Sequence, residues 1–221
     1  MHVRSFSSSG GEPLLVLLDM DECLIHSQFL SGTDYRQYED RTHEKKSAGG
    51  EGGVEQFSLE LPDGDVVVVN KRPGLDEFLE ACAGRWETRI FTAAMSVYAN
   101  PVLDTLDPDD EIFSKRYYRE QCTPHPSLGV YAKDLSLVVD DRDLKRVVLV
   151  DNNPMSFLTQ PSNGVLVSNF YDDPEDETLP AVMGLLEELD SLPDVRPKLH
   201  KMFGLREALQ GAVDKKVAGN R

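Results

Sequence analysis

The hydrophobic residues of this chain gather in short segments that are typical of strands buried inside a sheet. Leu14 to Leu18 is a compact apolar run, and the run from Val147 to Val150 contains only valine and leucine. Trp86 to Phe91 and Val165 to Val167 are two further candidates. Short apolar runs bounded by polar residues are common in parallel strands that are covered on both faces. We therefore predict a central, mainly parallel sheet.

Segments with helical spacing alternate with these strands. From Leu75 to Ala83 the apolar residues recur every three or four positions, and Gly84 is a plausible stop. A second helix is predicted from Val97 to Leu106, where it must accommodate Pro101 near its first turns. Pro174 and the acidic residues after it predict the start of a third helix, which carries apolar residues at helical spacing. Each of these helices follows a predicted strand or hairpin.

Three other segments complete the prediction. Phe57 to Leu61 and Val66 to Val69 flank the turn-forming residues 62–65, so we predict a β-hairpin. Residues 31–53 are polar and charged and end in glycines, which is typical of a mobile surface insertion. A last amphipathic segment is expected from Leu199 to Leu209.

Strands that alternate with helices predict one α/β domain, built as a three-layer sandwich around the parallel sheet. A chain of 221 residues is long enough for one well-buried domain of this kind and tight for two. We expect a flexible leader at residues 1–12, the domain at 13–195 with the β-hairpin as a small insertion, and a C-terminal helix and tail at 196–221.

Composition narrows the function classes. The formal net charge is −16, so general nucleic-acid binding is not expected, and a phosphate-binding site would have to be locally positive. The three cysteines show no paired spacing that would suggest a disulfide framework or a zinc site, which fits a reducing compartment inside the cell. No apolar run approaches the roughly twenty residues that a membrane-spanning helix needs. We expect a soluble, intracellular protein, nuclear or cytoplasmic, without a membrane partner.

Polar residues directly follow three of the predicted strands. Asp19 and Asp21 follow the first strand, Thr92 follows the second, and Asp151 with Asn152 follows the third. The carboxyl ends of parallel strands lie along one edge of an open sheet, which is where ligands bind. We therefore expect these side chains to meet in space.

The spacing of Asp19 and Asp21 suggests a metal site. In an extended chain, residues two apart point to the same side, so both carboxylates would share one small volume. Close carboxylates repel each other unless a cation lies between them, and oxygen ligands suit Mg²⁺. For an isolated pair of this spacing, the alternative is that both residues only cap the turn after a strand.

The segment from Leu14 to Ser27, LLVLLDMDECLIHS, resembles the first motif of the small RNA polymerase II C-terminal-domain phosphatases of the haloacid dehalogenase superfamily. The resemblance continues in the family's order through further motifs: KRPG at 71–74, FTA at 91–93, YAKDLS at 131–136 and VDN at 150–152. It covers residues 13 to 195 and implies a haloacid dehalogenase-like fold. Only 41 positions separate Thr92 from Lys133, too few for a large cap domain, so we expect an open site.

The resemblance assigns the chemistry to the paired aspartates. Asp19 corresponds to the nucleophile that attacks phosphorus, and Asp21 to the acid that protonates the leaving oxygen and later deprotonates water. Mg²⁺ would be held by the Asp19 carboxylate, the Asp21 backbone carbonyl and the Asn152 side chain. Asp151 would orient water or Lys133 without touching the metal.

Four further residues receive roles with alternatives. Thr92, Lys133 and Arg119 match residues that bind the transferring phosphoryl group. The alternatives are that Thr92 caps the next helix and that Lys133 and Arg119 are exposed surface cations. Tyr98 lines the substrate groove in one interpretation and is a packing residue in the other.

One position of the first motif departs from the family pattern. Cys23 stands where the family usually carries threonine, or sometimes valine. We expect a buried structural thiol rather than a thiol nucleophile, because no basic partner in the sequence argues for a lowered pKa. His26 is expected on the surface of a helix.

Three functions remain open from the sequence. The first is a Mg²⁺-dependent phosphoserine or phosphothreonine protein phosphatase with a phosphoryl-aspartate intermediate, acting on a phosphorylated protein or peptide, for which the family suggests an RNA polymerase C-terminal tail. The second is a non-catalytic peptide-binding module of the mitochondrial import-receptor type. The third is a small-metabolite phosphatase, which would need walls that enclose its ligand.

Overall fold

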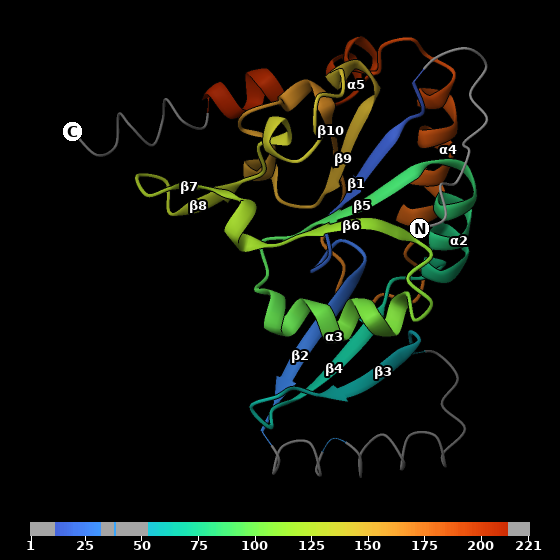
Figure 1. The fold of residues 1–221 in the computed structure, drawn as a ribbon, viewed down its shortest axis with the longest axis vertical. Coiled ribbons are helices and arrows are strands. Elements are labelled where there is room, and N and C mark those ends of the chain that lie inside the picture. Colours follow the sequence, from blue (N-terminus) through green and yellow to red (C-terminus); the bar gives the residue numbers. More distant parts are fainter. Residues whose placement is uncertain (1–11, 32–37, 39–52, 212–221) are drawn as a thin grey trace.

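A parallel sheet of five strands forms the centre of the molecule (Figure 1). The computed structural model describes residues 12–31, 38 and 53–211. The sheet has the order β10-β9-β1-β5-β6. Its strands are β1 (Leu15–Leu18), β5 (Glu87–Phe91), β6 (Phe113–Tyr117), β9 (Val147–Asp151) and β10 (Gly164–Leu166). This confirms the predicted parallel sheet and adds β6, whose polar sequence reflects its place at the sheet edge.

The register of the three central strands brings their carboxyl ends together. Leu18 on β1 lies opposite Ile90 on β5 and Val150 on β9. The residues that follow these strands therefore lie along one edge of the sheet, as predicted from the sequence.

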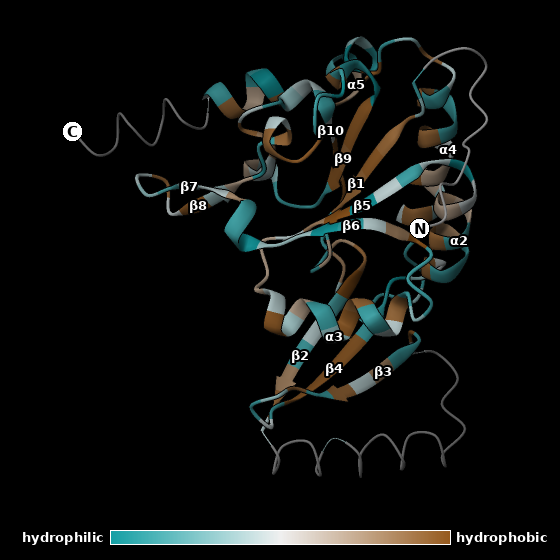
Figure 2. Cartoon of the chain, viewed as in Figure 1, coloured by the Kyte–Doolittle hydropathy of each residue, from teal (hydrophilic) through white to brown (hydrophobic). Residues whose placement is uncertain are grey.

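Alternate residues of β1 enter two different hydrophobic cores. Val16 and Leu18 belong to the core beneath three helices, α2 (Leu75–Arg85), α3 (Ser96–Leu106) and α4 (Thr178–Asp190). Leu15 and Leu17 face the other core, which includes residues of short 3-10 helices at 135–137 and 154–157 and of a helical segment at 205–211. Figure 2 shows the apolar central strands between more polar outer segments. The three-layer α/β sandwich is confirmed.

Two small antiparallel sheets accompany the main sheet. The predicted hairpin is confirmed as β3 (Gln56–Glu60) and β4 (Val66–Lys71), and β2 (Ile25–Leu30) pairs with β4 to complete the order β2-β4-β3. A second hairpin, β7 (Thr123–His125) with β8 (Val130–Ala132), extends from the body of the molecule (Figure 1). Between residues 92 and 133 the chain forms only α3, β6, a short 3-10 helix and this hairpin, so no large cap domain lies there.

Several predicted boundaries were wrong. Helix α4 begins at Thr178 rather than at Pro174, because the Asp176 carboxylate accepts the Thr178 backbone N–H and is held there by Arg72. Helix α2 continues through Gly84 to Arg85.

The predicted C-terminal segment is interrupted. Gly204 adopts a left-handed conformation (φ 56°) between α5 (Arg196–Phe203) and the helical residues 205–211. Leu199 and Leu209 are nevertheless buried, so this segment packs on the domain.

Some sequence expectations concern residues outside the described part of the chain. The leader at 1–12 is described only at Glu12, and the insertion at 31–53 only at residues 31, 38 and 53.

His26 lies on strand β2, so the expected helix-surface position was wrong. Among the described residues, no helix has the length and apolar character needed to cross a membrane.

Candidate active site

A cleft of about 680 Å³ opens at the carboxyl ends of the central strands. Every site residue predicted from the sequence lines it: Asp19, Asp21, Thr92, Tyr98, Arg119, Lys133, Asp151 and Asn152. The structure therefore brings together residues that are more than a hundred positions apart in the chain. This convergence confirms the expected meeting of the strand ends.

A buried lysine between two carboxylates forms the floor of the cleft. Lys133 Nζ donates to Asp19 Oδ1 (2.5 Å) and to Asp151 Oδ2 (2.6 Å). Lys133 is 2% exposed and Asp151 is fully buried. The interpretation of Lys133 as an exposed surface cation was therefore wrong. Sequence alone could not place it, because its burial comes from long-range contacts.

The backbone fixes this arrangement. The Asp19 N–H donates to the Val150 carbonyl (2.9 Å), which continues the pairing of β1 with β9 by one residue. The Lys133 N–H donates to the Ser156 carbonyl (3.0 Å). Asp151 Oδ1 accepts the Asn153 N–H (2.7 Å). Backbone hydrogen bonds therefore hold Asp19 and Lys133, and the Asp151 carboxylate is held directly by the Asn153 N–H.

Lys133 is shared by two carboxylates, and the pKa of one of them, Asp19, is raised. Burial raises the pKa of Asp19 from 3.8 to about 7, the repulsion of Asp151 adds to the increase, and Lys133 opposes it. Burial by itself would lower the pKa of Lys133, but Asp151 and Asp19 raise it above its usual range. Lys133 is therefore charged at neutral pH, and Asp19 needs further positive charge to be fully ionised.

Asp21 lies beside Asp19 on a tight turn. The Met20 carbonyl accepts the N–H groups of Leu24 (2.9 Å) and Ile25 (3.2 Å), which folds the chain back after β1. The Asp21 carboxylate accepts a hydrogen bond from the Tyr98 hydroxyl. Burial raises the pKa of Asp21 from 3.8 to about 6, although the Tyr98 hydrogen bond lowers it. A carboxyl group with this pKa can exchange a proton near neutral pH.

The three groups expected to hold Mg²⁺ each offer an oxygen lone pair that no described donor uses. Lys133 is the one described donor to Asp19 Oδ1, which leaves this oxygen a second lone pair for a cation, and no described hydrogen bond reaches the Asp21 carbonyl. Asn152 Nδ2 donates to Asn169 Oδ1 (3.0 Å), which leaves Asn152 Oδ1 without a donor in the same described set. All three residues line the cleft. This oxygen-rich donor set and the excess negative charge fit Mg²⁺.

The fit depends on a carbonyl and an amide as well as a carboxylate. Within the described ranges, no group of three or more His, Cys, Asp and Glu side chains is arranged to hold a metal ion. A site of the proposed type would not contain such a group, because only one of its protein ligands is an acidic side chain.

Thr92 and Arg119 occupy different depths of the cleft. Thr92 is 1% exposed, and its Oγ1 accepts the Ala94 N–H (3.0 Å). It does not cap α3, which begins after Met95 without a side-chain cap. Arg119 is exposed at the rim, where its Nε donates to the Ala93 carbonyl (2.7 Å) and its guanidinium lies 5.6 Å from the centre of the Tyr131 ring.

Cys23 lies below the turn that carries Asp21. Its side chain is fully buried, and its Sγ lies 3.8 Å from the Val150 carbonyl oxygen. Burial raises the pKa of the thiol well above its usual value, and the nearby Asp19 adds to this effect. Cys23 therefore remains a thiol in the folded protein, which confirms the expected structural role.

Arg72 is a residue whose importance the sequence did not reveal. It is 1% exposed and donates from Nη1 to the Cys23 carbonyl (2.8 Å) and from Nε and Nη2 to the Asp176 carboxylate (2.8 and 2.7 Å). It therefore ties the turn after β1 to the segment before α4. The one available signal was its place in the KRPG motif directly after an apolar strand.

The comparisons with known proteins agree with this geometry. A family model described as NLI interacting factor-like phosphatase matches residues 14–196. A probable C-terminal domain small phosphatase of Dictyostelium discoideum is 36% identical over 181 residues, which cover 82% of this chain and 52% of that protein. The CTD small phosphatase-like protein of Homo sapiens is 35% identical over 191 residues, which cover 85% and 60%. This chain thus spans about half to three fifths of these curated relatives.

A nuclear envelope relative and a solved structure extend the comparison. CTD nuclear envelope phosphatase 1B of Danio rerio is 39% identical over 133 residues, which cover 60% of this chain and 53% of that protein. The structure of Fcp1, an essential RNA polymerase II CTD phosphatase, matches with a TM-score of 0.54 at 21% identity, over 86% of this chain and 52% of that one. At this identity the structural match shows a shared fold alone. The family model matches residues 14–196, which is most of this chain. The chain therefore belongs to the family of NLI interacting factor-like phosphatases.

Proposed function

We propose that this protein is a Mg²⁺-dependent phosphoserine or phosphothreonine protein phosphatase that forms a transient phosphoryl-aspartate on Asp19. The observation that carries the proposal is the state of the Asp19 carboxylate. Its Oδ1 is held by buried Lys133, while its Oδ2 has no partner among the described residues and faces the same cleft as Asp21. A carboxylate held by one oxygen and free at the other is suited to in-line attack on phosphorus.

The two half-reactions follow from the positions of Asp19 and Asp21. Asp19 Oδ2 bonds to phosphorus while the bond from phosphorus to the substrate oxygen breaks, and that oxygen takes a proton from Asp21. Water then attacks the same phosphorus and gives a proton to Asp21, which releases inorganic phosphate and frees Asp19. Asp21 therefore starts protonated and returns to that state in each cycle.

The remaining residues support these two steps through charge and position. Lys133 holds Asp19 in place and presents positive charge to the phosphoryl oxygens, and Asp151 fixes Lys133. Thr92 and Arg119 are proposed to bind the phosphoryl group from the floor and the rim of the cleft. When bound by Asp19, the Asp21 carbonyl and Asn152, Mg²⁺ supplies further positive charge and keeps Asp19 ionised.

A protein substrate fits the shape of the cleft better than a small metabolite. Among the described residues, no cap domain covers the cleft, and exposed apolar side chains lie on its rim, among them Phe29, Met95 and Val97. Exposed apolar groups beside an open polar site suit an extended peptide. The names of the relatives make phosphorylated RNA polymerase II tails the first peptides to test. We also propose that the protein is located in the nucleus or the cytoplasm.

The proposal is tested with a generic aryl phosphate. Turnover should require Mg²⁺ and should disappear in Asp19→Asn, while the matched control Asp104→Asn should keep wild-type kcat/KM. Asp104 is suitable because it is exposed on α3 and pairs with Arg116 rather than with any of the proposed catalytic residues. A folded wild-type protein that shows no turnover with Mg²⁺, but binds peptides, would instead support the peptide-binding module.

The substrate class needs a separate panel. Phosphoserine and phosphothreonine peptides, including RNA polymerase tail peptides, should give higher kcat/KM values than sugar phosphates and nucleotides. The reverse order would favour a metabolite phosphatase. Rejection of the polymerase peptides alone would remove that substrate and leave the chemistry intact.

A further inference from the structure

Tyr98 connects helix α3 to the Asp21 carboxylate. Its hydroxyl donates to Asp21 Oδ1 and also lies 2.5 Å from Ser27 Oγ on strand β2. Its ring lies 5.1 Å from the ring of Phe29, measured between centres, at an angle of 51°. The phenol is thus fixed at two points, the ring and the hydroxyl, by residues that lie more than sixty positions away in the sequence.

The number of available protons shows which group is the donor in the hydrogen bond between Tyr98 and Asp21. A phenol carries one proton, and an ionised carboxylate can only accept, so Tyr98 donates to Asp21. The phenol then has no second proton for the contact with Ser27 Oγ, so with Asp21 ionised the Ser27 hydroxyl is the donor there. Within the described residues, Tyr98 is the only group that donates to the Asp21 carboxyl, so Oδ2 has no protein donor.

This arrangement distinguishes the two oxygens of Asp21. In a protonated carboxyl group, the carbonyl oxygen accepts hydrogen bonds and the hydroxyl oxygen donates them. Because the ionised carboxylate already accepts from Tyr98 through Oδ1, the proton that Asp21 takes up is expected on Oδ2.

We propose that Tyr98, held by Ser27, is a positioning residue that keeps the transferable proton of Asp21 on Oδ2, where it can reach the leaving oxygen. This inference rests on the proposed phosphatase function and adds a residue to it. As the bond from phosphorus to the substrate oxygen breaks, its electron pair moves to that oxygen, which takes the proton from Oδ2. Asp21 becomes a carboxylate at that moment, so its hydrogen bond from Tyr98 becomes charge-assisted and stronger. The contact therefore stabilises the transition state more than the ground state.

Two aryl esters of similar size and different leaving groups test the proposal. p-Nitrophenolate leaves as a stable anion without a proton, whereas phenolate gains much more from protonation. Tyr98→Phe should therefore lower kcat/KM for phenyl phosphate by about 10- to 100-fold, and for p-nitrophenyl phosphate by less than about 3-fold. The ratio kcat/KM is the correct quantity because it reports the steps up to departure of the leaving group.

Two further variants complete the experiment. Tyr118→Phe is the matched control. Like Tyr98, Tyr118 donates its hydroxyl to a side-chain oxygen, here that of Asn100, but it is not among the residues that line the cleft. It should change neither ester by more than about 3-fold. Ser27→Ala should give the same selectivity as Tyr98→Phe but a smaller loss, and it keeps the test possible if Tyr98→Phe does not fold.

The outcomes separate this inference from the proposed function. A wild type that hydrolyses both esters supports the function, and a selective loss for phenyl phosphate in Tyr98→Phe supports the positioning role. An equal loss of kcat/KM for both esters would show that Tyr98 only contacts substrate. No loss would show that Tyr98 has no role in the reaction. Either result overturns the inference while the proposed function stands. A wild type without any turnover refutes the function itself, and the inference with it.

Discussion

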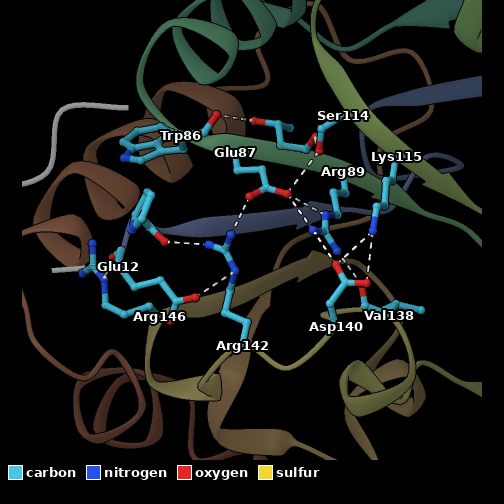
Figure 3. A network of polar contacts seen from close by, with 12 residues as sticks. Glu12, Trp86, Glu87, Arg89, Ser114, Lys115, Val138, Asp140, Arg142 and Arg146 are labelled. Atoms are coloured by element: carbon cyan, nitrogen blue, oxygen red, sulfur yellow. Dashed lines mark hydrogen bonds and ion pairs between the residues drawn. The ribbon is translucent and has the colours of Figure 1, made fainter. Parts of the chain in front are cut away.

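Strand β5 has buried charges near both of its ends, and the two ends satisfy those charges differently. At its amino end, Arg89 is 4% exposed and all five of its N–H groups have acceptors. Figure 3 shows the contacts to Glu87, Val138 and Asp140. A further hydrogen bond goes to the Tyr117 hydroxyl. Arg142 and Lys115 add further ion pairs to Glu87 and Asp140.

At the carboxyl end, the charges are not balanced. Lys133 is shared by Asp19 and Asp151, and Asp21 adds another carboxyl group nearby. The raised pKa of Asp19, to about 7, is the electrostatic consequence of this burial and excess negative charge. In the described part of the chain, Asp19 Oδ2 has no hydrogen-bond partner, whereas every N–H of Arg89 has one.

The difference shows which end serves the fold and which serves function. A fully paired network keeps buried ions at little net cost, whereas incompletely paired buried groups cost stability. Such groups are retained where a ligand completes them. We therefore expect mutations at the two ends to have opposite effects on stability and on activity.

The largest effect is expected for Asp19→Asn. Loss of the nucleophile should lower kcat/KM by at least about 10⁴-fold. The same change removes the excess negative charge, so the metal-free protein at pH 8 should unfold at a higher temperature than the wild type. Thermal melts and aryl phosphate kinetics on the same preparations test both parts. A lower melting temperature would contradict the idea that this end is electrostatically unfavourable.

Arg89→Met should produce the reverse pattern at the other end of β5. Removing the guanidinium breaks its hydrogen bonds to Glu87, Asp140 and the Val138 carbonyl, although Arg142 still pairs with Glu87 and the Tyr117 hydroxyl still donates to Val138. The free energy of unfolding should therefore fall by about 2–4 kcal/mol. The folded fraction should keep kcat/KM within about 3-fold of the wild type. Urea unfolding and kinetics at low temperature measure the two quantities. A large loss of activity in a stable variant would show that this network also serves catalysis.

The pH dependence of stability sharpens the comparison further. The pKa of Asp19 rises from 3.8 to about 7 on folding, and that of Asp21 from 3.8 to about 6. The folded protein therefore binds more protons than the unfolded chain in this range, and the metal-free free energy of unfolding should decrease as pH rises from about 4 to about 7, by on the order of 5 kcal/mol.

Two comparisons isolate the groups responsible for this decrease. Asp19→Asn should weaken the decrease, and Mg²⁺ should reduce it by favouring the ionised form of Asp19. Asp104→Asn should leave the slope unchanged. If Asp19→Asn and the wild type show identical slopes, the pKa of Asp19 is not raised as described.

The smallest effect is expected for Cys23→Val. The thiol is buried near the carboxyl end of β1, but it remains protonated and makes one weak contact, so the replacement should cost less than about 1.5 kcal/mol and change kcat/KM by less than about 3-fold. Denaturant unfolding and steady-state kinetics provide the measurements. A loss of activity greater than tenfold would place the thiol in the reaction.

The sequence predicted the elements whose burial has a simple pattern. Strand β9 contains only apolar residues before Asp151, and β1 contains only apolar residues before Asp19, so both strands and the residues after them were recognisable. Strands β2 and β6 were missed because their sequences, IHSQFL and FSKRY, mix polar and apolar residues at sheet edges. Their positions depend on neighbouring strands rather than on local pattern.

The same distinction applies to the site: some of its residues were recognisable from the sequence, and other features depend on long-range contacts. The identities of Asp19, Asp21 and Asn152 came from the strand ends and the family resemblance. The burial of Lys133, the pairing of Arg72 with Asp176 and the bond from Tyr98 to Asp21 join residues that are 77 to 114 positions apart. No local signal encodes such contacts, so only the fold reveals them.

The most direct test of the account is to identify the phosphorylated residue during turnover. Wild-type protein and Asp21→Asn would be mixed with a phosphorylated substrate and Mg²⁺, quenched in acid and reduced with borohydride, which converts a phosphoryl-aspartate to homoserine. Peptide mass spectrometry should find homoserine at position 19, with more of it in Asp21→Asn, because loss of the base slows hydrolysis of the intermediate. Turnover without modification at position 19, or with the phosphoryl group on another residue, would contradict the central claim.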